Sequence, residues 1–261
     1  MKVSYLIIVA LSLYLAALLY LYLTQDSKIF NFSLVKKVKS PVLKECQNCK
    51  EVKLKVKGAI LDGVIRDENS SKVILYFGGN ADDATEFIKI AKDIEDFDIV
   101  AFNYRGNALS TGKPSQDLLF HDALKIYDTF TKKRDKIIVI GRSLGSGVAS
   151  YLSSKRKTDG VLLITPYDSV ENLAKEKYPF FPISLLLKHK FKSFKYAKNI
   201  EAPIVIFMVK DDQTVPNKNT KNLEKYIPKL LEEKIFTDTT HADILTDPSF
   251  KKELKRVILR F

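Results

Sequence analysis

A serine lies between two glycines at residues 141–145, in the sequence Gly-Arg-Ser-Leu-Gly. The run 136–140 before it, apolar from Ile137 on, is typical of a buried strand, and residues 144–154 after it are typical of a helix. Glycines on both sides permit a sharp strand-to-helix turn that projects the hydroxyl of Ser143 at the edge of a sheet. The motif predicts that Ser143 is a nucleophile, and the alternative is a glycine-rich turn with an idle serine. Ser146 is a weaker candidate because it lies within the expected helix.

A nucleophilic serine needs a general base, and the sequence contains three histidines. His241 follows the last expected strand, in Thr-Thr-His-Ala-Asp, where a loop would carry it to the serine. His121 falls within an expected amphipathic helix and His189 within a lysine-rich segment, where exposed side chains are ordinary. His241 is therefore the expected base.

The base needs a carboxylate, and in strand-to-helix serine enzymes the order along the chain is Ser, Asp, His. The apolar run 203–209 is followed by Lys-Asp-Asp-Gln. Asp211 or Asp212 therefore lies at the carboxyl end of a parallel strand, where the sites of open sheets form. The alternative for either aspartate is a solvated turn or a helix cap. Asp168, in Pro-Tyr-Asp-Ser, is more typical of a helix cap.

Acyl transfer also needs two backbone N–H donors for the oxyanion. The amide of Leu144, next after the nucleophile, is the first expected donor. The second is expected from the loop after the third strand, at Asn80 in Phe-Gly-Gly-Asn-Ala. Gly-Gly-Asn is also common in ordinary turns, so a simple turn stays an alternative. This chemistry requires no metal and no cofactor, and none is expected.

Elements that could position these residues follow one another in a regular alternation. The expected strands are 51–57, 59–66, 72–77, 98–104, 136–141, 160–165, 203–209 and 234–237. The expected helices are 84–94, 116–132, 144–154, 217–226 and 248–259. Strands that alternate with helices predict an α/β fold with a mostly parallel central sheet and helices on both faces. Residues 166–202 break the rhythm and are expected to be a lid insertion over the active face.

The amino-terminal segment has a different composition from the rest of the chain. Residues 3–23 carry no charge and would span about 31 Å as a helix, at about 1.5 Å per residue, which matches a bilayer core. A cleaved signal peptide is the alternative, although its apolar region is usually shorter. We expect an anchor over 1–26, a basic and apolar connector over 27–50, and a catalytic domain over 51–261. The expected location is a single-pass position in the bacterial inner membrane.

The lysines leave the membrane orientation open. Lys2 and the amino terminus compete with Lys28, Lys36, Lys37 and Lys39, a balance that mildly favours a cytoplasmic body. The net charge is +12, from 43 Lys and Arg against 31 Asp and Glu, which favours anionic partners. Because no nucleic-acid-binding motif accompanies this charge, a membrane surface is the expected partner and nucleic acid is not.

Cys46 and Cys49 are the only cysteines in the sequence. Two ligands do not make a zinc site, and no strand precedes them as a redox motif would require. A local disulfide is expected if the body is exported, and two free thiols if it is cytoplasmic.

Several of these motifs together resemble the Bem46-type α/β-hydrolases from about residue 27 to the end. The motifs are Tyr-Phe-Gly-Gly-Asn-Ala, Asn-Tyr-Arg-Gly-Asn-Ala-Leu-Ser-Thr-Gly, Gly-Arg-Ser-Leu-Gly, Asp-x-x-Val-Pro and His241, and Tyr-Pro-Phe-Phe-Pro-Ile-Ser-Leu-Leu-Leu is similar to the family's short insertion. The Asp-x-x-Val-Pro spacing implies Asp212 rather than Asp211 as the acid. Relatives often carry His-Gly-Asn where this chain has residues 78–80, and Asp where it has Asn103, so the oxyanion loop is expected to be supported differently.

The resemblance implies a serine hydrolase that cleaves an ester, thioester or related acyl bond, with lipid or lipidated substrates favoured by a membrane location. Within the insertion, Phe180, Phe181 and Leu186 are the expected lining of an acyl pocket. An ordinary amphipathic lid would explain the same residues. The alternatives are a peptidase-like or small-ester hydrolase, and a non-catalytic interaction module bound to the membrane. The Arg105-Gly106 loop is expected to be scaffolding near the site.

Overall fold

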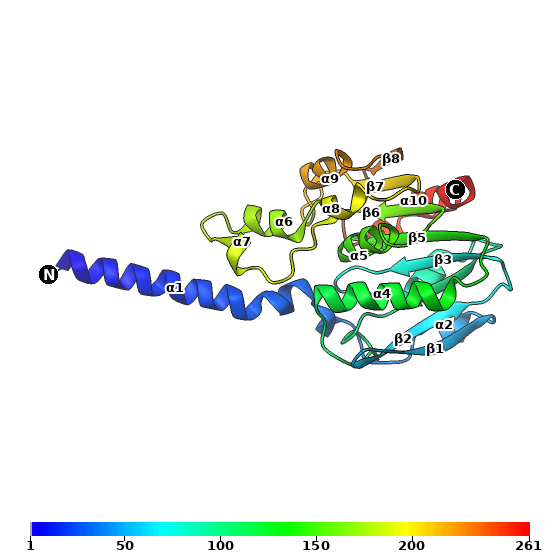
Figure 1. The fold of residues 1–261 in the computed structure, drawn as a ribbon, viewed down its shortest axis with the longest axis horizontal. Coiled ribbons are helices and arrows are strands. Elements are labelled where there is room, and N and C mark those ends of the chain that lie inside the picture. Colours follow the sequence, from blue (N-terminus) through cyan, green and yellow to red (C-terminus); the bar gives the residue numbers. More distant parts are fainter. Residues whose placement is uncertain (1) are drawn as a thin grey trace.

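A computed structural model describes residues 2–261, and its core is one sheet with helices on both faces (Figure 1). The strands are β1 (Cys49–Val56), β2 (Ala59–Arg66), β3 (Lys72–Phe77), β4 (Asp98–Phe102), β5 (Lys136–Arg142), β6 (Gly160–Ile164), β7 (Ile204–Val209) and β8 (Leu230–Phe236). Their order in the sheet is β1-β2-β4-β3-β5-β6-β7-β8. Only β2 pairs antiparallel with its neighbours β1 and β4, and the pairs from β4 to β8 are all parallel. The expected mostly parallel α/β sheet is confirmed.

Helices cover both faces of this sheet, and the amino-terminal helix projects away from it (Figure 1). The helices of the described residues are α1 (Lys2–Ile29), α2 (Val42–Glu45), α3 (Phe87–Ile90), α4 (Gln116–Phe130), α5 (Leu144–Ser153), α6 (Val170–Lys177), α7 (Ile183–Leu186), α8 (Ser193–Ala197), α9 (Asn217–Glu224) and α10 (Pro248–Arg260), with 3-10 turns at Phe32–Leu34, Ala84–Glu86 and Ile244–Thr246. Alternate residues of each strand supply the two cores. Val73 and Leu75 of β3 pack with α4, α5 and α8, whereas Ile74 and Tyr76 pack with α3 and α10.

The expected helix over 84–94 is wrong in its length. A 3-10 turn at Ala84–Glu86 leads into α3, which ends at Ile90. The guanidinium of Arg66, from β2, donates hydrogen bonds to the carbonyl oxygens of Ala91, Ile94 and Phe97. These carbonyls are therefore satisfied without a continuing helix.

Strand β8 begins at Leu230, four residues before the expected strand at 234–237. It lies at the edge of the sheet, paired with β7 alone. Its Leu-Leu-Glu-Glu start has no apolar alternation, because both of its faces are partly exposed. Periodicity therefore indicates only the last part of this strand.

Helix α1 projects away from the rest of the molecule, and the insertion lies along its second half (Figure 1). Its segment Val3–Ile29 has a mean hydropathy of 2.5 in its most apolar window, none of which is buried, so it is long and apolar enough to cross a membrane. The helix runs to Ile29, three residues past the expected end of the anchor at 26. The insertion 166–202 contains α6, α7 and α8.

The connector between α1 and β1 carries a disulfide between Cys46 and Cys49, whose Cα atoms are 5.4 Å apart. Of the two states that the sequence leaves open for these cysteines, the structure has the disulfide. The pair lies after α2 and at the start of β1, on the face of the sheet that α3 and α10 cover.

Candidate active site

Ser143 lies at a sharp turn between β5 and α5. Its φ of 47° and ψ of −116° are strained for a residue with a side chain. A Cβ at Gly145 would lie 2.1 Å from the carbonyl oxygen of Phe77, and a Cβ at Gly141 would lie 2.4 Å from the carbonyl oxygen of Gly145. Both positions therefore require glycine, because the helix passes against the neighbouring strand end without room for a side chain.

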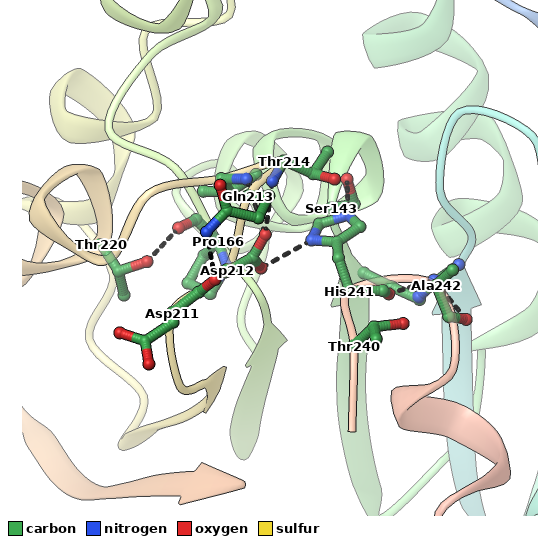
Figure 2. Close-up of polar contacts among 12 residues, drawn as sticks. Ser143, Pro166, Asp211, Asp212, Gln213, Thr214, Thr220, Thr240, His241 and Ala242 are labelled. Atoms are coloured by element: carbon green, nitrogen blue, oxygen red, sulfur yellow. Dashed lines mark hydrogen bonds and ion pairs between the residues drawn. The ribbon is translucent and has the colours of Figure 1, made fainter. Parts of the chain in front are cut away.

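The structure brings Ser143, His241 and Asp212 together from three different loops (Figure 2). His241 Nε2 lies 3.0 Å from Ser143 Oγ, and His241 Nδ1 lies 2.7 Å from Asp212 Oδ2. With its proton on Nδ1, the imidazole donates to the carboxylate and leaves Nε2 to accept the serine proton. Both distances are within the reach that general-base catalysis needs.

Asp212 is fixed by its own loop, which follows β7. Its Oδ1 accepts hydrogen bonds from the backbone N–H groups of Thr214 and Val215, both at 2.8 Å, so Oδ2 faces His241. The residue is buried, whereas Asp211 is exposed and its carboxylate points away from the imidazole in Figure 2. Between the two aspartates, only Asp212 contacts the histidine in the described part of the chain.

The other candidates lie elsewhere. His121 is exposed on α4 and contacts the carbonyl oxygen of Asp117 at 2.6 Å. His189 accepts from the backbone N–H of Gln116, and burial lowers the pKa of its imidazole. Asp168 precedes α6 and accepts from the backbone of Ser169 and the side chain of Asn172. The hydroxyl of Ser146 donates to the carbonyl oxygen of Ser143.

The two expected oxyanion donors lie on loops that pack against each other. A Cβ at position 145 would meet the carbonyl oxygens of residues 77 and 78, so the loop after β3 touches the start of α5. Within residues 2–261, the amides of Leu144 and Asn80 donate to no acceptor. The side chain of Asn80 accepts from the N–H of Asn31 and donates to the carbonyl oxygen of Lys28, which ties this loop to the end of α1.

Sequence reasoning missed Arg142 and Asp82, which join these loops. Arg142 Nη1 lies 2.5 Å from both carboxylate oxygens of Asp82, and its Nη2 donates to the carbonyl oxygen of His241 at 2.7 Å. Asp82 Oδ2 in turn accepts from the N–H of Gly79 in the oxyanion loop. The available signal was the arginine in Gly-x-Ser-x-Gly, because an arginine before a buried turn needs an acidic partner.

A cavity of about 900 Å³ opens beside this site, between α1 and the insertion. Its lining includes Leu186 of the three expected pocket residues. Phe181 stacks on Tyr14 of α1 instead, and Phe180 is 85% exposed. The cavity extends to Gln213 and Thr214, the two residues that follow Asp212.

Comparison with known proteins identifies this architecture. The family model described as "alpha/beta hydrolase fold" matches residues 72–182. An alpha-beta hydrolase from Vibrio vulnificus is 18% identical and superposes with a TM-score of 0.73 over 91% of this chain and 92% of that one. The esterase Pf2001 of Pyrococcus furiosus is 20% identical, with a TM-score of 0.68 over 87% of this chain and 97% of that one. The chain has the α/β-hydrolase fold.

Curated relatives match a shorter part of the chain. An uncharacterized protein of Mycobacterium tuberculosis is 27% identical over 153 residues, which cover 56% of this chain and 54% of that one. The lysophosphatidylserine lipase ABHD12 of Macaca fascicularis is 30% identical over 173 residues, which cover 57% of this chain and 43% of that one. The chain therefore spans about half the length of the curated relatives that it matches.

Proposed function

We propose that this chain, which has the α/β-hydrolase fold, is a membrane-anchored serine hydrolase that cleaves an acyl ester or thioester. The observation that carries the proposal is the contact of His241 with both Ser143 Oγ, at 3.0 Å, and the buried Asp212, at 2.7 Å. A serine with such a base becomes a nucleophile at neutral pH. Similarity to an esterase fold and to a lipase sequence supports the same reaction class.

The reaction proceeds through an acyl-enzyme. His241 Nε2 takes the proton of Ser143 as Oγ attacks the carbonyl carbon, and Asp212 stabilises the imidazolium that forms. The negative charge on the carbonyl oxygen is stabilised by the amides of Leu144 and Asn80, each worth about 3 kcal/mol in the transition state. The imidazolium then protonates the leaving group. Water, deprotonated by the same histidine, releases the acid and restores the serine.

The molecule is organised for work at a bilayer. In this proposal, residues 1–26 are the anchor, 27–50 the connector and 51–261 the catalytic domain, with the insertion 166–202 as its lid. The length and hydropathy of α1 support a membrane span. A relative is named as a lysophosphatidylserine lipase, which makes lipid esters the first substrates to test.

Labelling with a tagged fluorophosphonate tests the proposal directly, because this reagent reacts only with an activated serine. Membranes that contain the full chain are expected to label, and Ser143→Ala or His241→Ala is expected to abolish labelling. Ser146→Ala is the matched control, since it removes a neighbouring buried hydroxyl and is expected to retain labelling. Absence of labelling in folded wild-type protein would favour a non-catalytic module, and activity on short esters alone would favour a small-ester hydrolase.

A further inference from the structure

The insertion contacts α1 from Tyr14 to Gln25. These eleven residue steps correspond to about 16 Å along the helix axis. The hydroxyl of Tyr14 donates to the carbonyl oxygen of Phe180, and its ring stacks on Phe181 with centroids 5.5 Å apart. Further along, the buried side chain of Gln25 donates to the carbonyl oxygen of Leu186 and accepts from the N–H of Lys188 at 2.7 Å. The anchor and the insertion therefore form one structural unit.

The walls of the cavity between them are mostly apolar, and the cavity extends from α1 to the loop that carries Asp212. Leu21 and Ile29 line it from the helix, and Leu173 and Leu186 line it from the insertion. At its other end it reaches Thr214, whose N–H holds Asp212. Its volume of about 900 Å³ falls in the range of roughly 300–1,000 Å³ that is usual for small-molecule sites.

The tip of the insertion carries exposed apolar side chains beside the uncharged part of α1, where a membrane would cover them. Phe180 and Leu185 are 85% and 87% exposed. They belong to the segment that contacts Tyr14, which is nine residues, or about 14 Å, inside the end of the uncharged run at Leu23. Half of a hydrocarbon core is about 15 Å thick, so a spanning α1 would place this tip within one leaflet.

We infer that α1 and the insertion together bind one fatty-acyl chain of a membrane lipid, which enters the cavity from the leaflet with its ester directed toward Ser143. The inference rests on the proposed anchor and hydrolase function and adds the acyl site and its route. Lys28 and Lys177 also line the cavity, and their long side chains can reach the anionic headgroup region.

Chain-length selectivity tests the acyl site. The full-length protein is reconstituted in vesicles, and kcat/KM is measured for palmitoyl and acetyl esters of one leaving group. Leu21→Trp fills the cavity from the helix side, and the palmitoyl-to-acetyl ratio is expected to fall about tenfold or more. Leu19→Trp, the same change on an exposed position of α1, is expected to leave the ratio unchanged. An unchanged ratio in Leu21→Trp would overturn the inference.

A binding measurement separates this inference from the proposed chemistry. Ser143→Ala protein is titrated with a radiolabelled palmitoyl lysophospholipid, which requires no turnover. Binding is expected, and expected to weaken about tenfold when Leu21→Trp is added and not when Leu19→Trp is added. If the wild-type protein has no hydrolase activity but Leu21→Trp still weakens binding and Leu19→Trp does not, the proposed hydrolase is refuted and the acyl site is retained. Stronger binding of an S-palmitoyl peptide than of the lipid would overturn the lipid assignment.

The depth of the insertion can be measured because the sequence contains no tryptophan. Phe180→Trp then provides a single tryptophan, at the tip of the insertion. Its emission is expected to be quenched by lipids brominated on their acyl chains. Ile60→Trp, at an exposed position of β2, is the control and is expected to remain unquenched. Equal emission of Phe180→Trp in brominated and ordinary vesicles would show that the tip lies in water and would overturn entry from the leaflet.

Discussion

Arg142 is the residue on which the geometry of the site depends most, although it touches none of the reacting atoms. Its guanidinium binds Asp82, which accepts from the N–H of Gly79 in the loop after β3, and it also binds the carbonyl oxygen of His241, the proposed base. Burial by itself would lower the pKa of Arg142, but the charge and hydrogen bond of Asp82, with the charges of Tyr76 and Asp212, together outweigh it and raise the pKa above its usual range.

Replacing Arg142 by lysine retains the charge but removes the planar pair of donors, so one of its two partners is lost. We expect Arg142→Lys to lower kcat by on the order of 100-fold through displacement of His241, with a small change in KM. Steady-state kinetics on a soluble ester, with thermal unfolding measured in parallel, checks this. A loss of stability with unchanged kcat in the folded fraction would show that Arg142 only supports the fold.

Arg105, in contrast, stabilises the fold. Its guanidinium donates to both carboxylate oxygens of Asp122 on α4, at 2.8 and 2.7 Å, and to the carbonyl oxygen of Lys57, and both charged side chains are buried. The pair joins the loop after β4 to the hairpin and to α4. This agrees with the scaffolding interpretation of the Arg105-Gly106 loop.

Removing one member of a buried ion pair leaves the other charged and unpaired. We therefore expect Arg105→Ala to lower the free energy of unfolding by about 3–5 kcal/mol. The folded fraction is expected to retain the kcat of wild type. Denaturant unfolding and active-site titration of the same sample measure both quantities. A large fall in kcat per folded molecule would instead give this loop a direct contact with substrate.

At the scale of elements, periodicity identifies most of the fold because buried parallel strands are continuous apolar runs. Strands β3, β5 and β7 and helix α5 appear in the structure within one or two residues of their expected positions. Helix α3 and strand β8 differ, since Arg66 ends one through long-range hydrogen bonds and the other is an edge strand with little apolar pattern. Local sequence cannot indicate either effect.

The sequence likewise indicates some residues of the candidate site and not others. Ser143 and His241 are predicted from motifs beside strand ends, and the choice of Asp212 over Asp211 from the family resemblance; the structure brings the three side chains together. The pocket residues could not be assigned in this way, because the side that a loop residue faces depends on what packs against it. Phe180 and Phe181 lie along α1, more than 150 positions away in the sequence, and only the tertiary contact with Tyr14 determines where they point.

Glu171 joins segments of the insertion to one another. It lies in the first turn of α6, accepts from the hydroxyl of Ser184 on α7, and forms ion pairs with Lys175 and Lys192. Burial alone would raise the pKa of Glu171, but hydrogen bonds from Lys192, Ser184 and Lys175 outweigh it and lower the pKa to about 2. Because the folded pKa lies below the ordinary value of 4.5, the ionised carboxylate stabilises the insertion above pH 4.5. That contribution is lost as the pH falls from 4.5 toward 2.

We expect Glu171→Gln to free the insertion at neutral pH, since it removes the charge that Lys175 and Lys192 neutralise. Limited proteolysis at pH 7 is expected to cut residues 178–187 faster in the variant, by about tenfold. Glu253→Gln, which removes a carboxylate from an exposed ion pair on α10, is the control and is expected to cut at the wild-type rate. Equal cleavage rates of Glu171→Gln and wild type would show that the insertion is held by its other contacts.

At the scale of the whole molecule, two features indicate opposite sides of the membrane for the catalytic domain. Four lysines, Lys28, Lys36, Lys37 and Lys39, follow the uncharged run 3–23, against Lys2 and the amino terminus before it, which favours a cytoplasmic body. The disulfide between Cys46 and Cys49 is stable where the compartment is oxidising, outside the cytoplasm. The lysine excess is small, so it is the weaker indication. The disulfide is the stronger one, because the cysteines are close enough to bond without any movement of the chain.

We therefore expect the catalytic domain to lie on the oxidising side of the membrane. Cells that express the full chain are denatured in a maleimide reagent large enough to shift the protein on a gel, with or without prior reduction. The unreduced chain is expected to gain no adduct and the reduced chain two. Cys46→Ser leaves Cys49 without a partner and is the control that should gain one adduct without reduction. Two adducts on the unreduced wild type would place the domain in the cytoplasm. The acyl chain would then enter from the inner leaflet, because the insertion contacts the half of α1 nearest to the domain.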